Sequence, residues 1–268
     1  MRQKKETICI LVAAHKKCSL PHQAMYHPIQ VGAAGKEDFG YLRDDTGEHI
    51  SEKNPVYCEL TAMYWMWKNL DVPYCGLIHY RRYFQNSKTL RSLFSGKKDF
   101  VNLLDEKHVK QILQKQDVIL PKKRNYYIET IYSHYAHTHY KEHLDVMGNI
   151  LRERCPEYLD SYQKILRGTK AHMFNMLIMK KELYDAYCAW LFPLLEELEK
   201  RIDSSSYDAF QKRYPGRVSE ILLNVWVEQN KLAYKELPVA MCGRVRWGKK
   251  IYSFLKAKFR GIRYQSSF

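Results

Sequence analysis

The sequence contains no apolar run that approaches the roughly 20 residues needed to span a bilayer. It also lacks the Gly-x-x-x-x-Gly-Lys-Ser/Thr motif of P-loop enzymes, the Gly-x-Gly-x-x-Gly motif of dinucleotide-binding folds and the Gly-x-Ser-x-Gly motif of α/β-hydrolases. The short apolar stretch at residues 8–14 leads directly into His15 and two lysines, so we interpret it as a strand and not as a signal peptide. These absences favour a cytoplasmic protein and disfavour three large enzyme classes.

Cysteine pairs with metal-binding or redox spacing are absent as well. The seven cysteines are odd in number, scattered along the chain, and form no Cys-x-x-Cys pair. A disulfide framework or a structural zinc site would need paired, regular spacing. We therefore expect reduced thiols that are mostly buried.

Acidic residues are missing from the C-terminal end of this basic chain. The formal net charge is +15, and residues 244–268 contribute +8 of it, because they contain eight lysines and arginines and no acid. On a helix, Trp247 and Phe254 fall on an apolar arc that faces most of these basic residues, a pattern typical of helices lying in a membrane surface. We predict a catalytic domain at residues 1–243 and a basic amphipathic tail that binds an anionic membrane. The alternative is a C-terminal helix that packs on the body and exposes a solvated basic face.

Apolar segments with strand and helix periodicity alternate along the body. Three short apolar runs are typical of buried strands: residues 8–14, 74–79 and 117–121. Amphipathic helical segments begin at Asn54 and Asp105, both good N-caps. Further along, residues 171–179 are predicted to form a strand and Ser219 to cap a helix. Strands that follow helices indicate an α/β domain with a mostly parallel central sheet flanked by helices.

Basic residues follow the second of these predicted strands. Residues 76–84 read GLIHYRRYF, which places His79, Arg81 and Arg82 between aromatic residues at the carboxyl end of the strand. Ligands of open α/β sheets bind beyond the carboxyl ends of the strands. Guanidinium groups offer planar forks of donors to phosphate oxygens. The segment therefore predicts a diphosphate site, with a solvated basic edge or arginines paired to nearby acids as the alternative.

The segment at residues 126–143 is rich in tyrosine and histidine. Tyr135, His137 and His139 are its candidate acceptor-binding residues, because aromatic rings interleaved with polar groups suit stacking on the apolar faces of sugars. The histidine spacing does not match His-Glu-x-x-His. We therefore expect a polar binding surface here and no metal site, with metal ligation as the alternative.

Four carboxylates are candidates for acid–base chemistry: Asp44, Asp45, Glu59 and Glu220. Glu220 stands near a predicted helix start. It is either an acid that stabilises this helix through the helix dipole or a base that deprotonates an acceptor hydroxyl. The residues alone leave both interpretations open.

Several motifs resemble those of one bacterial family. Residues 54–69 (NPVYCELTAMYWMWKN) and 76–84 (GLIHYRRYF) are similar to the signature of capsular and exopolysaccharide biosynthesis glycosyltransferases that were long described only as a domain of unknown function. Shorter matches are LRDDTG at 42–47, FNMLIMK at 174–180, EILLN at 220–224 and ELPV at 236–239. The resemblance covers residues 8–239, which is nearly the whole body.

This resemblance implies a GT-A-like nucleotide-diphospho-sugar transferase fold and a UDP-sugar donor, with galactofuranose or another hexose as the sugar. Many GT-A enzymes hold Mn²⁺ or Mg²⁺ on the donor diphosphate with an Asp-x-Asp motif at a strand exit. The equivalent exit here carries His79-Tyr-Arg-Arg82 instead. Metal dependence therefore stays open: arginines would replace the charge of the metal, or Asp44 and Asp45 would form a metal site of another kind.

The same resemblance assigns roles to particular residues. Glu220, or else Asp45, is the expected catalytic base. The expected donor-binding residues are His15, Val31, Gly32, Asp44, His79, Arg81, Arg82, His172 and Asn175. Asn175 belongs to a segment that is similar to the one lining the donor sugar in such folds.

The leading hypothesis is an inverting hexosyltransferase that lies peripherally on the inner face of the cell membrane. It would move a sugar from a UDP-sugar to a lipid-linked oligosaccharide in capsule or exopolysaccharide synthesis. Nucleic acid is not an expected partner, since the residues before the tail carry only +7. Two alternatives remain, a non-catalytic nucleic-acid-binding protein and a polysaccharide-assembly protein that binds the donor without turnover.

Overall fold

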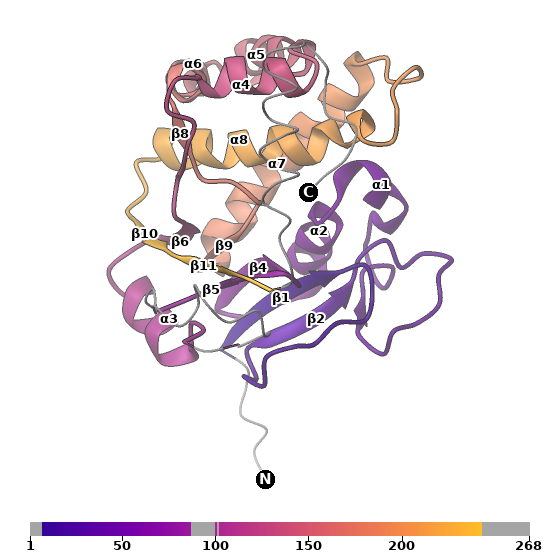
Figure 1. The fold of residues 1–268 in the computed structure, drawn as a ribbon, viewed down its shortest axis with the longest axis vertical. Coiled ribbons are helices and arrows are strands. Elements are labelled where there is room, and N and C mark those ends of the chain that lie inside the picture. Colours follow the sequence, from indigo (N-terminus) through magenta and orange to yellow (C-terminus); the bar gives the residue numbers. More distant parts are fainter. Residues whose placement is uncertain (1–6, 87–99, 101, 243–268) are drawn as a thin grey trace. The chain divides into compact units, whose positions relative to one another are not determined.

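The computed structural model describes residues 7–86, 100 and 102–242, and the predicted tail at 244–268 lies outside them. The described residues form two compact units. The first unit takes its residues from Met1–Lys122, Phe174–Trp190 and Leu232–Gly243, and the second from Lys123–Met173 and Leu191–Lys231. Figure 1 labels their helices and strands. No helix within the described ranges is long and apolar enough to cross a membrane.

A nine-stranded sheet organises the described part of the first unit (Figure 1). Its main path runs β10-β6-β9-β4-β1-β2-β3, and β5 and β11 extend it from β4. Neighbours on this path are parallel except that β9 is antiparallel to both β4 and β6. The strands are β1 (Ile8–Ala14), β2 (Tyr26–Gln30), β3 (Leu42–Arg43), β4 (Tyr74–His79), β5 (Arg82–Phe84), β6 (Val118–Pro121), β9 (Leu177–Lys180), β10 (Tyr234–Leu237) and β11 (Val239–Met241). The predicted α/β class with a mostly parallel central sheet is confirmed.

Burial of both faces explains why the central strands read as unbroken apolar runs. All seven residues of β1 are buried, as is typical of parallel strands that are covered on both sides. Alternate residues of β1, which share one face, pack in a core with Val109 and Leu113 of α3 (Glu106–Leu113). The predicted cap of α3 is confirmed, since the Asp105 carboxylate accepts a hydrogen bond from the amide of His108 at 3.0 Å.

The helix predicted from Asn54 is divided in two. α1 (Asn54–Tyr57) ends at Cys58, whose φ is 55° and ψ −129°, and α2 (Leu60–Asn69) begins two residues later. A positive φ at a residue with a side chain cannot continue an α-helix. The predicted N-cap role of Asn54 is wrong, because Asn54 is the first helical residue. Its side chain instead donates to the Cys58 carbonyl at 2.7 Å and stabilises the break.

The strand predicted at residues 171–179 is also wrong. The chain forms the short β8 (Lys170–Ala171), leaves the extended conformation, and forms β9 only from Leu177. Phe174 and Asn175 between them have φ values of 81° and 50°. Two consecutive left-handed residues interrupt any strand, and an apolar sequence pattern does not reveal them.

The second unit is mainly helical in its described part. It contains α4 (Ile131–Thr138), α5 (Glu142–Arg154), α6 (Leu159–Arg167), the C-terminal part of α7 (Lys181–Arg201), α8 (Tyr214–Gln229) and a two-stranded antiparallel sheet of β7 (Arg124–Asn125) and β8. Within it, the Tyr162 hydroxyl of α6 donates to the Leu144 carbonyl of α5 at 2.7 Å. The predicted cap at Ser219 is wrong, because α8 begins at Tyr214 with Pro215 in its first turn and buries Ser219 inside the helix.

The seven cysteines are free thiols, but fewer of them are buried than the sequence predicts. Cys9, Cys75 and Cys188 are buried, and burial raises the pKa of the Cys75 thiol to about 12. The other four are only partly buried. A raised pKa keeps a buried thiol protonated and unreactive. The buried cysteines therefore contribute to packing.

Candidate functional site

Basic groups surround the ring of Tyr80 at the carboxyl ends of β1 and β4 in the first unit. The Tyr80 amide donates to the Ala13 carbonyl of β1 at 3.1 Å, which fixes the turn after β4. The His15 ring meets the Tyr80 ring edge-on at a centroid distance of 5.2 Å. Lys16 Nζ and the guanidinium carbon of Arg81 lie 5.8 Å and 5.4 Å from the centre of the Tyr80 ring. Three basic side chains therefore gather where α/β sheets bind ligands, an arrangement that suits a diphosphate.

A second cluster in the first unit converges on Phe174 and Asn175. His79 Nε2 donates to the Phe174 carbonyl at 2.9 Å. The guanidinium carbon of Arg82 lies 4.3 Å from the centre of the Phe174 ring. Asn175 Nδ2 donates to Glu59 Oε1 at 2.8 Å. Of the predicted donor-binding residues, the structure thus brings His79, Arg82 and Asn175 together, while the neighbouring Arg81 turns to a different ring.

Glu59 is the acidic group of this second cluster. Burial raises its pKa, but the charge and hydrogen bond of His79 and the hydrogen bond from Asn175 outweigh burial, and the pKa is lowered overall. His79 Nε2 lies 3.6 Å from Glu59 Oε1. An ionised, partly buried carboxylate that accepts bonds from its neighbours is a weak base and holds those neighbours in place. We therefore assign Glu59 the positioning of Asn175.

The turn at Phe174 and Asn175 has a backbone conformation that side chains rarely adopt. Both residues have positive φ values, and each such residue costs about 1–3 kcal/mol. Strained backbone of this kind clusters at ligand-binding sites, where the surrounding contacts over-determine it. Here the contacts of His79, Arg82 and Glu59 hold the turn in place.

Asp44 is part of the scaffold of the loop that follows β2. Its side chain is fully buried, and its two oxygens accept hydrogen bonds from the amides of Gly32 and Ala33 at 2.8 Å and 2.9 Å and from Ser51 Oγ at 2.5 Å. Asp44 takes up the Gly32 amide and Val31 is buried, and direct binding of the donor by these three residues stays a prediction. These residues hold the loop that leads away from β2.

Asp45 forms a separate ion pair. Arg43 donates to both of its oxygens, from Nε at 3.0 Å and from Nη2 at 2.7 Å. These bonds lower the pKa of Asp45, which weakens it as a base. The oxygens of Asp44 are directed at the loop amides and Ser51, whereas those of Asp45 are directed at Arg43, so the two carboxylates do not converge on one cation. The pair of Asp44 and Asp45 therefore does not fit a metal site, and in the described residues no cluster of three or more His, Cys, Asp or Glu could hold one.

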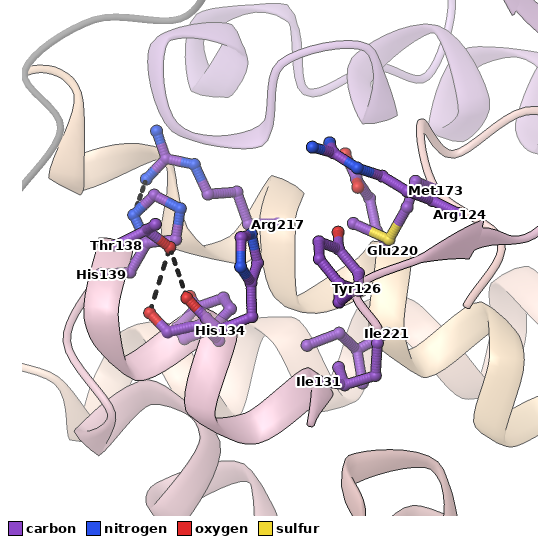
Figure 2. A pocket seen from close by; sticks show the side chains of 11 residues that line it. Arg124, Tyr126, Ile131, His134, Thr138, His139, Met173, Arg217, Glu220 and Ile221 are labelled. Atoms are coloured by element: carbon purple, nitrogen blue, oxygen red, sulfur yellow. Dashed lines mark hydrogen bonds between the residues drawn. The ribbon is translucent and has the colours of Figure 1, made fainter. Parts of the chain in front are cut away.

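The second unit contains a pocket with a volume of about 200 Å³ (Figure 2). It is lined by Arg124, Tyr126, Ile131, His134, Tyr135, Thr138, His139, Met173, Arg217, Glu220 and Ile221. The predicted base and two of the three predicted acceptor-binding residues, Glu220, Tyr135 and His139, therefore meet in one pocket. The volume is below the about 300–1,000 Å³ of pockets that enclose drug-sized ligands, which suits a small polar group such as one sugar.

Arg217 and His139 form a polar wall of this pocket. Arg217 Nη1 donates to His139 Nδ1 at 3.2 Å (Figure 2). The guanidinium carbon of Arg217 also lies 3.9 Å from the centre of the Phe210 ring. Burial and then the charge of Arg217 lower the pKa of His139 to about 2. The imidazole is therefore neutral at physiological pH, and its Nδ1 accepts the bond from Arg217.

Glu220 lies one turn after Arg217 on α8, so both side chains project from the same face of that helix. Tyr126 and Arg124 come from β7 and the residue after it. Burial and the charge of Glu220 raise the pKa of Tyr126 to about 12, against the opposing charge of Arg124. The pocket thus combines a carboxylate, two guanidiniums and a protonated phenol (Figure 2). This set can accept a proton from a hydroxyl and donate hydrogen bonds to a sugar.

His137, the third predicted acceptor-binding residue, is exposed and does not line the pocket. Its Nδ1 donates to Glu129 Oε1 at 2.9 Å, and His134 Nδ1 donates to Glu129 Oε2 at 2.8 Å. Other rings of the segment pack on rings elsewhere in the second unit, such as Tyr140 on Tyr207 at a centroid distance of 4.4 Å. The segment is therefore partly internal packing and only partly the polar surface that its composition predicts.

His172 belongs to the second unit, whereas the other predicted donor-binding residues belong to the first. It is buried, its amide donates to Asn224 Oδ1, and its carbonyl accepts from Asn224 Nδ2, both at 2.8 Å. These bonds fix the chain beside α8. The sequence prediction also missed Arg124 and Arg217. The spacing of Arg217 three residues before Glu220 was a usable signal, while nothing in the sequence places Arg124 near them.

Comparison with protein families identifies the chain. Residues 9–231 match the family described as "Domain of unknown function (DUF4422)", and the chain belongs to this family. No curated protein matches the sequence.

A solved structure is also similar to this chain. The apo structure of WbbM, described as a bifunctional glycosyltransferase, matches with a TM-score of 0.79 and 29% sequence identity. The match covers 89% of this chain and 46% of the WbbM chain. This protein therefore spans less than half of the length of that relative.

Proposed function

We propose that this protein is a glycosyltransferase that moves a hexose from a UDP-sugar to a lipid-linked glycan, with inversion at the anomeric carbon. The observation that carries the proposal is the match of 89% of this chain, at a TM-score of 0.79, to part of a bifunctional glycosyltransferase. Membership of the family extends over residues 9–231, which include both candidate sites. The residues of the two candidate sites supply the chemical groups that such a transfer needs.

The donor diphosphate binds at the carboxyl ends of β1 and β4. His15, Lys16 and Arg81 around Tyr80 supply donors and positive charge there without a metal ion. In the transition state the bond between the anomeric carbon and the diphosphate oxygen breaks, and its electron pair leaves with UDP. Cationic donors that meet this developing charge stabilise the leaving group.

The donor sugar contacts the turn at Phe174 and Asn175. The carbonyl and ring of Phe174 are held by His79 and Arg82, and the Asn175 side chain by Glu59. A side-chain amide in a fixed orientation distinguishes hydroxyl positions on a sugar. A sugar with its hydroxyl in a different position leaves the buried amide without a hydrogen-bond partner, which costs free energy. Asn175 is therefore the expected determinant of sugar choice.

Glu220 acts as the base and its pocket receives the acceptor. The acceptor hydroxyl gives its proton to the Glu220 carboxylate while its oxygen forms a bond to the anomeric carbon. Arg124, Arg217, Tyr126 and His139 bind the other oxygens of the acceptor sugar. Asp45, the second candidate base, is held by Arg43 and has no part in this scheme.

The acceptor is the lipid-linked intermediate of a capsular or exopolysaccharide, and galactofuranose is a candidate for the transferred sugar. The resemblance to the polysaccharide family supports this part of the proposal, as does the basic, amphipathic sequence of residues 244–268. The protein would then work peripherally on the inner face of the cell membrane.

Thermal unfolding of the full chain with a panel of UDP-, GDP- and dTDP-sugars tests the donor class. We expect stabilisation by UDP-sugars, at equal concentration, with EDTA as well as with Mn²⁺. Stabilisation by another nucleotide sugar alone would contradict the UDP assignment. Stabilisation that disappears in EDTA would show that a metal, and not the basic residues around Tyr80, carries the diphosphate. UDP-sugar binding without transfer to any extracted lipid-linked glycan would favour the polysaccharide-assembly alternative.

A further inference from the structure

Among the large hydrophobic residues that the structure describes, the two most exposed are neighbours in the sequence. Tyr127 and Ile128 are each 79% exposed, whereas the other exposed large hydrophobic residues, Leu42, Tyr234 and Met241, range from 37% to 45%. Tyr127 and Ile128 follow β7 in the second unit, and we call them the Tyr127–Ile128 tip. Two adjacent apolar side chains that project into solvent have a cost in water unless a partner covers them.

The backbone of this tip is held in place. The Tyr127 amide donates to Asn125 Oδ1 at 2.9 Å, and the Ile128 amide donates to the Tyr126 carbonyl at 2.8 Å. Tyr127 has a φ of 58°, which a tyrosine rarely adopts. This turn exposes both apolar side chains to solvent, in a backbone conformation that is itself unfavourable for tyrosine.

The residues on either side anchor the tip to the second unit. Before it, the Tyr126 ring packs on the His134 ring at a centroid distance of 4.1 Å. After it, Glu129 is buried and accepts hydrogen bonds from His134 and His137. Burial raises the pKa of Glu129, but the two histidine bonds outweigh burial and lower it overall. Because the residues on both sides of the tip are held by these contacts, the tip has a defined position on the second unit.

Positive charge precedes the tip in the sequence. Lys122, Lys123 and Arg124 stand three to five residues before Tyr127, and residues 118–128 contain no acid. An aromatic and an aliphatic side chain next to basic residues is the combination that binds the interface of anionic bilayers. Each lysine or arginine near such a surface adds attraction to the anionic lipid. A protein partner would need an acidic and apolar surface that matches the tip in shape. The segment has no further feature that would select such a surface.

We infer that the Tyr127–Ile128 tip is a membrane-contact site that inserts into the interface of an anionic bilayer. Tyr126 and Arg124, which line the pocket of Glu220, lie immediately before the tip in the chain. Insertion of the tip therefore brings the mouth of this pocket close to the lipid surface. The part of the inference that concerns acceptor delivery rests on the proposed function, whereas lipid binding by the tip does not.

Sedimentation of the full chain with vesicles of phosphatidylglycerol and phosphatidylcholine tests the tip. The variant carries Tyr127→Asn, which suits a positive φ, together with Ile128→Ser. We expect its dissociation constant for the vesicles to rise about tenfold, from the loss of two inserted side chains. All variants keep residues 244–268, so the contribution of the tail is constant. Binding equal to that of the unaltered protein would overturn the inference.

Two control variants separate insertion from a change in folding. Tyr127→Trp with Ile128→Leu keeps both apolar groups and should bind the vesicles normally, and its added tryptophan should be quenched by brominated lipids. Leu42→Ser removes an exposed apolar side chain of the first unit and should leave binding unchanged. If the tip variant loses binding to a soluble glycan and not to vesicles, the tip is a glycan contact and the membrane assignment is wrong.

A transfer assay distinguishes this inference from the proposed function. The tip variant should transfer sugar normally to a water-soluble acceptor and slowly to an acceptor embedded in vesicles. If no transfer or UDP-sugar binding is found but the tip variant still loses vesicle affinity, the proposed function fails and the membrane-contact site stands.

Discussion

The carboxylates at the two candidate sites have different surroundings. In the first unit, Asp44, Asp45 and Glu59 each accept hydrogen bonds from groups of the protein itself. In the second unit, Glu220 lines a pocket beside two arginines and a neutral histidine. Acids that accept bonds from loop amides and side chains are typical of a scaffold, whereas a carboxylate that lines a pocket among groups with shifted pKa values is a candidate for proton transfer.

This difference divides the proposed reaction into two tasks. The first unit supplies positive charge and a shaped turn for the donor, and its acids hold the loops that present them. The second unit supplies the base for the acceptor. Variants of single residues should therefore separate donor binding, folding and proton transfer. The predictions below are ordered from the largest expected effect to the smallest.

Glu220→Gln should have the largest effect. Loss of the base should lower kcat by about 10²–10⁴-fold, while the affinity for the UDP-sugar stays unchanged, since the donor binds to residues of the first unit. Initial rates of transfer and calorimetric titration with the donor measure the two quantities. Glu228→Gln on the same helix, where Glu228 pairs with the exposed Lys164, is the matched control and should retain full activity.

Asp44→Ala should destabilise the protein by about 3 kcal/mol, because two backbone amides and the Ser51 hydroxyl lose their buried acceptor. Urea unfolding followed by circular dichroism measures this. Asp45→Ala is the matched control from the next position and should cost less than about 1 kcal/mol, as it breaks only a partly exposed ion pair. Equal effects of the two substitutions would contradict the scaffold role of Asp44.

Arg81→Ala should weaken UDP-sugar binding about tenfold, which corresponds to about 1.4 kcal/mol, because one charged donor to the diphosphate is lost. Calorimetric titration at low ionic strength measures the affinity, and added salt should reduce the difference from the unaltered protein. Arg152→Ala on α5 removes an exposed guanidinium of the second unit and should have no effect. If the affinity of the Arg81 variant is unchanged, the diphosphate does not bind at the basic residues around Tyr80.

His139→Gln should alter the pH dependence of stability. Burial lowers the pKa of His139 to about 2, so below pH about 6.5 the unfolded chain binds a proton that the folded chain does not. Folding is therefore weakened as the pH falls, by up to about 1.4 kcal/mol per pH unit. The variant should lose this part of the slope between about pH 6.5 and 4 in urea titrations. The unaltered protein, titrated under the same conditions, is the reference for this slope.

Much of the fold could be predicted from the sequence, because buried parallel strands leave unbroken apolar runs such as residues 8–14. The positive φ values of Cys58, Phe174 and Asn175 could not, since residues with side chains give no signal for that conformation as glycine does. These residues divide the predicted helix from Asn54 and interrupt the predicted strand at 171–179.

The candidate sites were predictable to different degrees. The basic residues after β4 were visible because a strand end is a local feature. The meeting of Glu220 with Tyr135 and His139 was implied by resemblance and not by spacing, since it depends on how α4 and α8 pack in the second unit. The burial of Asp44 was not predictable, because three donors from separate segments converge on it.

One measurement tests the central claim most directly: UDP-sugar affinity and the rate of transfer at saturating donor, determined together for Arg81→Ala and Glu220→Gln. The division of tasks predicts that the Arg81 variant loses donor affinity and keeps most of its rate when the donor is saturating. It predicts that the Glu220 variant binds the donor normally and does not transfer the sugar. A Glu220→Gln protein that transfers sugar at the rate of the unaltered protein would contradict the claim.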